Sequence, residues 1–494
     1  MKRLLALLLA ISMIVLSLAA CGDEKTDVVE NTDSTATQDP NLPAIPEGID
    51  ISGEFNILVS GNMERNDFDA DESATTTVDV AIYRRNEAIK QAYGVTILND
   101  DITKFNSAPA TGSGTGFSAI YNDYMAGNAR YDAAMVGTYD VATLAYNGLL
   151  WDLNSLPYID LTKGYWDQKA NEDLAVGGKM FYTTGDISIV DNIYTHALLF
   201  NKNIIDDYGL DDPYELVRND QWTLEKLTSL VKQVGQDVDQ NGVYNEKDMY
   251  GLLTFKDPTL AIMAGAGEQV ATINDDGEIE LTFYNERVVN LYDQFEDLLF
   301  DQAHVFNYQY DNATGNQASQ SVWDTNRDSI FNENRAAFYF NPLSVVERHR
   351  DSEVDFGILP YPKFDATQEE YGHNVSAYHT QFLCIPVMSK NAATSGAVVE
   401  LLAYYGQQYL TPAYYEKTLY GQYVRDEEST EMLDIIFATR VFDVGIYYSI
   451  GTYNTELGNI CFSRNSIATI YETHRNEAES KIKSLNDSFA KLSY

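Results

Sequence analysis

Residues 132–150, DAAMVGTYDVATLAYNGLL, contain a short apolar strand followed directly by a helix. The run 132–137 carries no charge after its first residue, which is typical of a strand buried on both faces. Residues 138–140 start the following helix, and Gly148 ends it. A buried strand that leads straight into a helix is the unit from which α/β folds are built.

The same alternation continues in both directions along the chain. We expect strands at 54–60, 196–201, 336–341, 356–362 and 382–387, and helices at 77–93, 117–127, 223–235 and 396–408. About 440 residues are too many for one hydrophobic core and enough for two or three domains. The sequence therefore predicts an α/β protein of more than one domain, with largely parallel sheets.

The first fifty residues have a different composition. Lys2 and Arg3 precede an apolar run over residues 4–20, which is typical of a secretory signal peptide. The tetrapeptide LAAC that ends at Cys21 resembles the lipobox of bacterial lipoproteins, in which the cysteine is diacylated; the alternative is an ordinary signal peptide with an incidental cysteine. We expect a signal peptide over 1–20, a lipidated Cys21 and a disordered polar tether up to residue 50.

Composition limits the possible partners. The formal net charge is −41, from 74 acidic and 33 basic residues, which excludes nucleic acid. Thirty-five tyrosines supply flat apolar faces with a polar tip, a combination common at binding surfaces. Besides Cys21 there are only Cys384 and Cys461, too few for a metal site, and the sequence leaves open whether they pair.

The segment 237–248, DVDQNGVYNEKD, matches the spacing of a calcium loop. Oxygen ligands are expected at positions 1, 3, 5, 7 and 12, and Gly242 is at the turn. The expected ligands are Asp237, Asp239, Asn241, Val243 through its carbonyl, and Asp248. One helix precedes the loop and a strand follows it, so we expect a structural calcium site rather than a sensor. The alternative is a solvated turn rich in Asp and Asn.

Catalytic motifs are missing from the sequence. It contains no G-x-S-x-G elbow, no H-E-x-x-H and no Walker A motif. With so many acidic residues, a carboxylate pair of the kind used by glycosidases stays open as a minor alternative. We expect a binding protein and no catalytic cofactor.

Five segments, in this order and spacing, give the chain a family resemblance. They are RYDAAMVGTYDVATLAYNGLLWDLNSL (130–156), GGKMFYTTGDISIVDNIYTHALLFNKNII (177–205), FNENRAAFYFNP (331–342), DFGILPYPK (355–363) and FLCIPVMSKNAATSGAVVELLAYY (382–405). Together with the lipobox, they resemble extracellular solute-binding proteins of the family 1 type, the sugar-binding receptors of ABC importers. The likeness covers essentially everything after residue 51.

The resemblance implies a two-lobed periplasmic-binding-protein-like fold of type II, with hinge strands between the lobes. Lobe one would comprise 51–192 and 343–392, and lobe two 193–341 and 393–494. The chain would cross between them near 194–198, 341–342 and 391–396. Ligand would bind in the cleft between the lobes, outside the carboxyl ends of strands.

By the same resemblance, ligand-contacting residues are expected at strand ends and at the hinge. They are Thr138, Tyr139, Asp140, Asp186, Ser188, Asn192, Tyr194, Asp257, Glu268, Trp323, Asn341 and His379. Asp186 is the preferred acceptor for sugar hydroxyls. Asp140 is alternatively a helix cap, and Trp323 alternatively a core residue.

These residues lead to one functional expectation and its alternatives. We expect a lipid-anchored, monomeric receptor on the extracellular face of a bacterial membrane, which captures a carbohydrate by hinge closure and delivers it to ABC permease subunits. A scarcity of Lys and Arg near the expected cleft argues against an anionic ligand. Alternatives are a peptide or other solute as ligand, or a membrane sensor as the partner.

Overall fold

The computed structural model describes residues 41–46, 48–311, 316–317, 319–415, 419 and 426–492. The expected signal peptide and Cys21 lie outside this range. In the part of the chain that is described, no helix is both long and apolar enough to cross a membrane. Residues Pro43–Tyr494 form one compact unit, so most of the expected tether precedes it.

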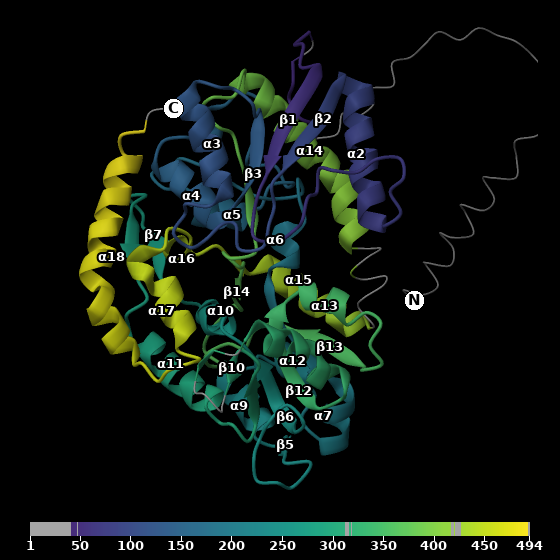
Figure 1. The fold of residues 1–494 in the computed structure, drawn as a ribbon, viewed down its shortest axis with the longest axis vertical. Coiled ribbons are helices and arrows are strands. Elements are labelled where there is room, and N and C mark those ends of the chain that lie inside the picture. The colour runs from purple at the N-terminus through teal and green to yellow at the C-terminus, as the bar shows by residue number, and fades with distance from the viewer. Residues whose placement is uncertain are drawn as a thin grey trace, which may run out of the picture. The chain divides into compact units, whose positions relative to one another are not determined.

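The first lobe is built on a four-stranded sheet with the order β15-β3-β1-β2. Its strands are β1 (Gly53–Val59), β2 (Val95–Asp101), β3 (Ala133–Gly137) and β15 (Gln381–Cys384). All five residues of β3 are buried, which explains its uncharged sequence. Its helices are α2 (Thr77–Tyr93), α3 (Thr115–Ala126), α4 (Thr138–Tyr146), α5 (Gln168–Asp173) and α14 (Ala392–Pro412), with the short helix η1 (Leu153–Ser155) (Figure 1).

The second lobe is built on a larger sheet, β13-β4-β12-β6-β5, with β9 also paired to β6. Its strands are β4 (His196–Asn201), β5 (Gly235–Gln236), β6 (Met249–Thr254), β9 (Val305–Asn307), β12 (Ala336–Pro342) and β13 (Phe356–Leu359). Around it lie α7 (Lys202–Tyr208), α8 (Pro213–Arg218), α9 (Leu224–Val231), α10 (Pro258–Gly265), α11 (Glu286–Leu299), α12 (Gln320–Asn332), α13 (Ser344–Arg348) and α15 (Glu427–Ala438).

Smaller elements complete the chain. They are α6 (Val190–Ile193), the hairpin β7 (Ala271–Ile273) and β8 (Ile279–Leu281), the pair β10 (Tyr310–Asp311) and β11 (Asn316–Gln317), and the pair β14 (His373–Asn374) and β16 (Arg440–Val441). The C-terminal region consists of α16 (Val444–Tyr447), η3 (Ile450–Thr452), α17 (Tyr453–Asn459) and the long helix α18 (Ile467–Phe489).

The α/β class with two lobes is confirmed, but the sheets are mixed rather than largely parallel. Strand β15 runs antiparallel to β3, and β4 runs antiparallel to both β12 and β13. Both β4 and β15 follow directly on segments that cross between the lobes. Each therefore enters its sheet from the cleft side, against the direction of the parallel strands.

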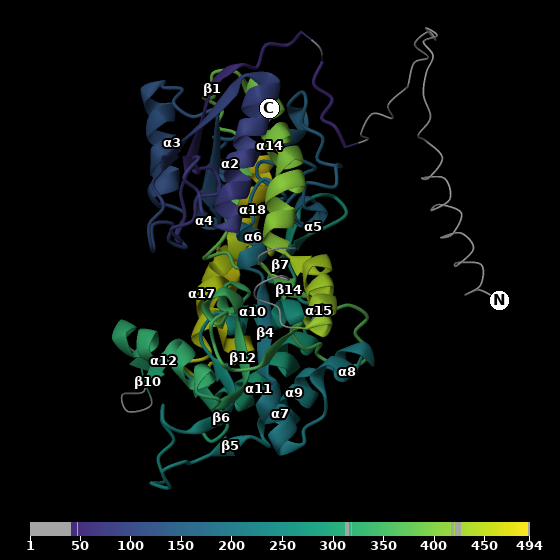
Figure 2. The same cartoon turned by 90° about the vertical axis from the view of Figure 1, so that its right-hand side faces the viewer.

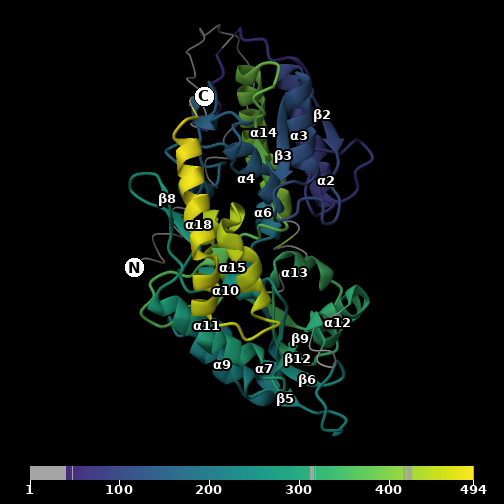
Figure 3. The same cartoon turned by 60° about the vertical axis from the view of Figure 1, so that its left-hand side comes forward.

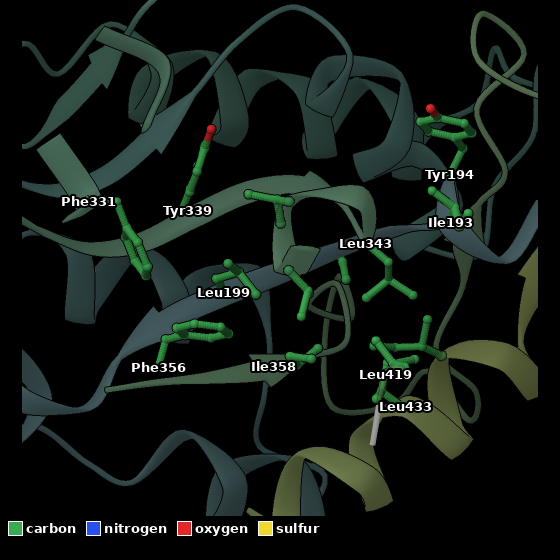
Figure 4. Packing of buried hydrophobic residues seen from close by; sticks show 14 of the residues in the cluster. Ile193, Tyr194, Leu199, Phe331, Tyr339, Leu343, Phe356, Ile358, Leu419 and Leu433 are labelled. Atoms are coloured by element: carbon green, nitrogen blue, oxygen red, sulfur yellow. The ribbon is translucent and has the colours of Figure 1, made fainter. Parts of the chain in front are cut away.

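One hydrophobic cluster fills the second lobe and continues into the hinge. Figure 4 shows Leu199, Tyr339 and Phe356 from neighbouring strands packed against Phe331 of α12. The same cluster includes Ile193 of α6. Burial of such side chains stabilises the fold by about 1.5–3 kcal/mol each. Because the cluster also includes Val78 and Ile82 of α2, the segment that links the lobes is anchored against both of them.

The expected lobe boundaries need two corrections. Strand β13, at 356–359, pairs with β4 in the second lobe, although 343–392 was assigned to lobe one. Helix α14 packs along α2 in the first lobe, although 393–494 was assigned to lobe two (Figure 2). Sequence order alone does not say which sheet a short strand joins, because that depends on its pairing partner.

The chain passes between the lobes at α6–β4 and again just before β15. Thr195 and Val375 form an antiparallel bridge, and the Ser376 amide donates to the Tyr194 carbonyl oxygen at 3.1 Å. The end of β12 contacts this hinge, where the Leu343 amide donates to the Thr195 carbonyl oxygen at 2.9 Å. The chain does not cross there, because the next strand, β13, joins the same sheet as β12.

The crossing expected at 391–396 is wrong. Asn391 caps the start of α14 by accepting from the Thr394 amide, so this segment stays in the first lobe. The next α-helix in the described part of the chain, α15, packs against β13 of the second lobe.

The lobes also touch on a second side. The turn of the β7–β8 hairpin meets the first lobe, where the Gly177 amide donates to the Gly277 carbonyl oxygen at 2.8 Å. Both glycines have positive φ, 62° and 77°, and a Cβ on Gly277 would lie 3.1 Å from the Gly177 Cα. Positive φ favours glycine at both positions, and at Gly277 a side chain would also crowd the Gly177 main chain.

Buried Glu400 fixes α14 to the first lobe. Its carboxylate accepts from the Tyr165 hydroxyl at 2.5 Å and from the Trp166 indole at 3.0 Å. We expect Glu400→Ala to lower the free energy of unfolding by about 2–4 kcal/mol, because two buried donors lose their acceptor. Urea unfolding measures this, with exposed Gln408→Ala on the same helix as the control. Equal stability of both variants would contradict the assignment.

Candidate functional site

A cavity of about 540 Å³ lies between the two lobes at the hinge. The first lobe contributes residues that follow strands, including Met63 after β1, Phe105 after β2 and Tyr139 in the first turn of α4. The hinge contributes Tyr194, His196 and residues 376–379.

The second lobe contributes residues that follow β6, β9 and β12. Phe255, Lys256 and Asp257 come directly after β6, Tyr308 follows β9, and Asn341 lies at the end of β12. Because β6 is parallel to both β9 and β12, these three strands end at the same edge of the sheet. The cavity therefore lies outside the carboxyl ends of the parallel strands of both lobes, where open α/β sheets bind ligands.

Aromatic rings form much of the wall. Tyr194 stacks on His379, with ring centroids 4.9 Å apart and planes at 16°. Tyr308 stacks on Phe255 at 5.3 Å and 24°. At the mouth Phe105 is 62% exposed, which is unusual for phenylalanine and leaves its ring free to contact a ligand.

The polar groups of the wall are mostly neutral. The Ser376 hydroxyl lies 2.7 Å from His379 Nδ1, and burial together with nearby Arg348 lowers the pKa of His379 to about 3. The histidine is therefore uncharged, and its 3.9 Å approach to Asp257 is no ion pair at neutral pH. Burial raises the pKa of Asp257 to about 6, so its carboxyl group titrates close to physiological pH.

Three cations line the cavity, contrary to the expected scarcity of Lys and Arg. Arg348 and Arg327 both pair with Asp328, at 3.1 and 3.3 Å, which compensates their charge. Lys256 forms no ion pair with any residue that the structure describes. Arg327 lies in α12, the helix that also contains Trp323. Arg348 ends α13, which follows Asn341 and the end of β12.

Two wall residues carry buried polar atoms without a hydrogen-bond partner in the described structure. They are His196 Nε2 and Asn454 Oδ1. Sequence reasoning missed Asn454, since nothing in its neighbourhood marks a strand end. Tyr308 and Tyr378 were also missed, although one follows a short apolar strand and the other precedes His379.

Five of the expected ligand residues line this cavity. They are Tyr139, Tyr194, Asp257, Asn341 and His379. Six others do not line it and are used elsewhere within the fold, and the side chain of Trp323 lies outside the described residues.

Thr138 and Asp140 hold the first lobe together. The Thr138 hydroxyl donates to the Thr380 carbonyl oxygen at 3.1 Å. The Asp140 carboxylate accepts from the amides of Gly114 and Phe117, at 2.7 and 3.1 Å. Asp140 thus stabilises the start of α3, the helix that precedes α4 in the chain, by accepting hydrogen bonds from its first amides.

Asp186, the preferred sugar acceptor, does not line the cavity. Its carboxylate accepts from Thr411 Oγ1 at 2.6 Å and from Gln407 Nε2 at 3.1 Å, both on α14. Ser188 donates to Asp67 at 2.7 Å. The expectation for Asp186 is corrected because α14, which the sequence assigned to the other lobe, takes up its hydrogen bonds.

Three further expected ligand residues lie in α6, just after α10 and in α12. Asn192 accepts from the Arg440 guanidinium, and Glu268 accepts from Asn285 Nδ2 at 2.8 Å. Trp323 lies in α12, but its side chain is outside the described residues.

A buried ion cluster lies behind the hinge. Arg440 of β16 pairs with Asp167 of the first lobe and, at 2.9 Å, with Asp191 of α6. Burial raises the pKa of Asp191 to about 7 despite the opposing effect of this arginine. The guanidinium connects three segments that meet where the lobes join.

The loop 237–248 lies at the opposite end of β6 from the cavity, since β6 begins at Met249. Carboxylate oxygens of Asp237, Asp239 and Asp248 lie within 4.8 Å of one another. Asp237 accepts from the Gly242 amide at 2.7 Å, and Gly242 has a φ of 78°. The loop brings the expected carboxylates together, and this donor set suits a hard cation such as Ca²⁺.

The remaining two expected ligands of the loop are Asn241 and Val243. The Asn241 side-chain oxygen accepts from the Val243 amide at 2.7 Å, and the Val243 carbonyl accepts from Asn245 Nδ2 at 3.1 Å. Elsewhere in the chain, Cys384 and Cys461 are both buried and free, so they do not pair.

Comparison with known proteins places the chain among binding proteins. Residues 104–408 match the profile of the family described as bacterial extracellular solute-binding protein. No curated protein sequence matches the chain significantly.

Solved structures share the fold at low sequence identity. A cyclic alpha-maltosyl-1,6-maltose binding protein from Arthrobacter globiformis is 13% identical, with a TM-score of 0.57, over 87% of this chain and 99% of the other. The maltose/maltodextrin-binding domain MalE from Bdellovibrio bacteriovorus, bound to maltotriose, is 16% identical, with a TM-score of 0.54, over 87% and 100%. An ABC substrate-binding protein from Listeria monocytogenes in complex with cycloalternan is 12% identical, with a TM-score of 0.53, over 89% and 99%.

Proposed function

The chain belongs to the bacterial extracellular solute-binding proteins, and from this premise we propose that it captures a carbohydrate between its lobes and delivers it to an ABC importer. The observation that carries the proposal is the cavity itself. Aromatic and polar side chains both line it, and they come from both lobes. Flat aromatic faces suit sugar rings, while amide and carboxyl groups suit their hydroxyls.

The solved relatives support the carbohydrate class. Their bound or named ligands are maltotriose, cycloalternan and a cyclic maltosyl-maltose. The cations Lys256, Arg327 and Arg348 in the wall would also suit a sugar that carries an acidic group.

Hinge closure is the proposed mechanism. At the hinge, the segments at Thr195 and Val375 lie next to each other, and β16 pairs beside them, so the proposed rotation of the lobes takes place about this narrow group of strands. A ligand that contacts Tyr139 in one lobe and Asp257 in the other gains contacts only when the lobes are close together. Such a ligand shifts the population toward the closed form, which the permease subunits then recognise.

Anchoring at the membrane is proposed from the leader sequence. Cys21 would carry the lipid, residues up to 50 would act as a tether, and the mature protein would be a monomer on the extracellular face. A membrane sensor is the alternative partner, and a peptide or another small solute the alternative ligand. Members of this family bind solutes, which disfavours the hydrolase alternative.

A thermal-shift assay tests the proposed ligand class. Residues 51–494, in calcium, would be screened against neutral oligosaccharides, uronate-containing oligosaccharides and peptides. A ligand present at 100 times its dissociation constant stabilises by about 2.7 kcal/mol, which raises Tm measurably. A rise with glycans alone supports the proposal, whereas a rise with peptides alone contradicts it.

Asp257 should make binding depend on pH. Because burial raises its pKa to about 6, its carboxylate forms as pH rises through that value and can then accept from ligand hydroxyls. We expect the affinity for a bound glycan to fall about tenfold from pH 7 to pH 5. Asp257→Asn should bind more weakly at pH 7 and show a flat profile, as measured by titration calorimetry.

Asp186→Asn is a matched control for this experiment. Burial also raises the pKa of Asp186 to about 6, but its carboxylate faces α14 rather than the cavity. This variant should therefore keep the wild-type pH profile of binding. A flat profile for Asp186→Asn, with an unchanged profile for Asp257→Asn, would reverse the two assignments.

We further propose that the loop 237–248 holds a structural calcium ion. The ligands would be Asp237, Asp239 and Asp248, with Asn241 and the Val243 carbonyl oxygen. The ion would offset the repulsion between the three clustered carboxylates and so stabilise the start of β6.

Asp237→Ala should abolish a calcium-dependent rise in Tm while leaving glycan affinity unchanged. Differential scanning fluorimetry in calcium and in chelator measures the first effect. Exposed Asp276→Ala, in the β7–β8 turn, is the control and should keep the wild-type response. A wild-type Tm that does not respond to calcium would refute the ion.

A further inference from the structure

A second cavity of about 560 Å³ adjoins the one between the lobes. The two cavities share Ala110 and Tyr139 as wall residues. The second cavity is bounded by α4 of the first lobe, by residues 447–452, and by α18, which runs alongside (Figure 3). We infer that it is a continuation of the ligand site and takes further sugar units of an oligosaccharide, an inference that rests on the proposed carbohydrate ligand.

The wall of the second cavity combines tyrosines with hydroxyl groups and with the charged side chains of Glu477 and Lys481. Its aromatic members are tyrosines, namely Tyr139 and Tyr146 on α4 together with Tyr447 and Tyr448. Hydroxyl groups surround them, including Ser449, Thr452, Ser480 and Ser484. A surface of aromatic faces and hydroxyls suits a neutral polyol chain better than a purely apolar ligand.

The far side of this cavity is held in place by α18. The Tyr146 hydroxyl lies 2.7 Å from Ser484 Oγ, and Lys481 Nζ lies 4.7 Å from the centroid of the Tyr146 ring. Tyr146 is half-buried, so part of it stays open to the cavity. A ligand here would touch both α4 and α18.

A thin partition of hydrogen bonds separates the cavities. The Ser449 hydroxyl donates to the Ala110 carbonyl oxygen at 2.6 Å. Asn454 Nδ2 approaches Ser449 Oγ at 3.4 Å and the Tyr139 hydroxyl at 3.5 Å. These last two bonds are at the long limit of hydrogen bonding, and the Asn454 side-chain oxygen has no partner in the described structure. Ligand hydroxyls would replace the long bonds and satisfy this oxygen.

The backbone next to the partition is strained. Ser449 and Thr452 have φ of 48° and 56°, in the left-handed region that a β-branched residue such as threonine rarely adopts. Strained residues of this kind persist where the surrounding structure holds them, and they gather at ligand sites. Here the strain turns the chain so that residues 449 and 452 face the second cavity, while Asn454 lines the first.

Blocking the second cavity tests the inference. Ser480 is an exposed residue of α18 that lines it, so Ser480→Trp should fill the space without disturbing the core. The probes are malto-, cello- and xylo-oligosaccharides of two to six units, with affinities measured by titration calorimetry. Wild-type affinity should rise with chain length, and Ser480→Trp should weaken the longest chains by about tenfold while changing the shortest bound chain less than about twofold.

Two other variants accompany it. Asn476→Trp lies on an exposed part of the same helix outside both cavities and should bind like the wild type. Lys481→Ala removes a wall residue instead of adding one, and should selectively weaken the longer chains by about threefold or more.

The outcomes separate this inference from the proposed function. Wild-type affinity that is independent of length, or equal weakening of short and long chains in Ser480→Trp, would overturn the extended site while leaving carbohydrate capture intact. No binding of any glycan to the wild-type protein would overturn both.

Discussion

The buried guanidinium of Arg440 is the interaction on which the hinge depends. An isolated charge in a protein interior costs several kcal/mol, and Arg440 is tolerated because Asp167, Asp191 and Asn192 surround it. These partners come from the first lobe and from α6, while Arg440 itself follows α15 of the second lobe. Loss of Arg440 would leave the buried carboxyl groups of Asp167 and Asp191 without their cation, so residues from both lobes depend on this one guanidinium.

The geometry of the ligand cavity depends on this buried ion cluster. Asp191 and Asn192 belong to α6, which leads directly into Tyr194 and Thr195 at the crossing. Because α6 is also anchored in the hydrophobic cluster through Ile193, the ring of Tyr194 has a defined position against His379. The aromatic wall between the lobes is therefore set by charge pairing and apolar burial together.

Much of the fold was predictable from the sequence, because strands buried on both faces leave uncharged runs. The strand expected at 132–137 is β3 at Ala133–Gly137, and its helix begins at Thr138 as expected. Lobe membership was harder to predict, since β13 joins the second sheet only through pairing with β4. Such pairing depends on tertiary context that a local pattern does not contain.

The site was predictable only in part, for the same reason. Asp186 and Asp257 are both aspartates at turns after apolar segments, and only the packing of α14 distinguishes them. The arginines of α12 and α13 lie in helices, and the sequence does not show which face of a helix turns toward the cavity, so the charge of the wall was misjudged. The role proposed for Asn454 and for the strained turn before it depends on two cavities that meet there, and the sequence shows neither cavity.

The contact between Gly177 and Gly277 has a mechanical consequence. It lies away from the hinge bridge, and its backbone atoms meet without any side chain that could bend or change rotamer. Rotation of the lobes about the hinge therefore has to keep this main-chain contact or break its hydrogen bond, because no side chain there can adjust to a new spacing. Two turns of main chain, and not the ligand alone, thus help to set how far apart the lobes stand.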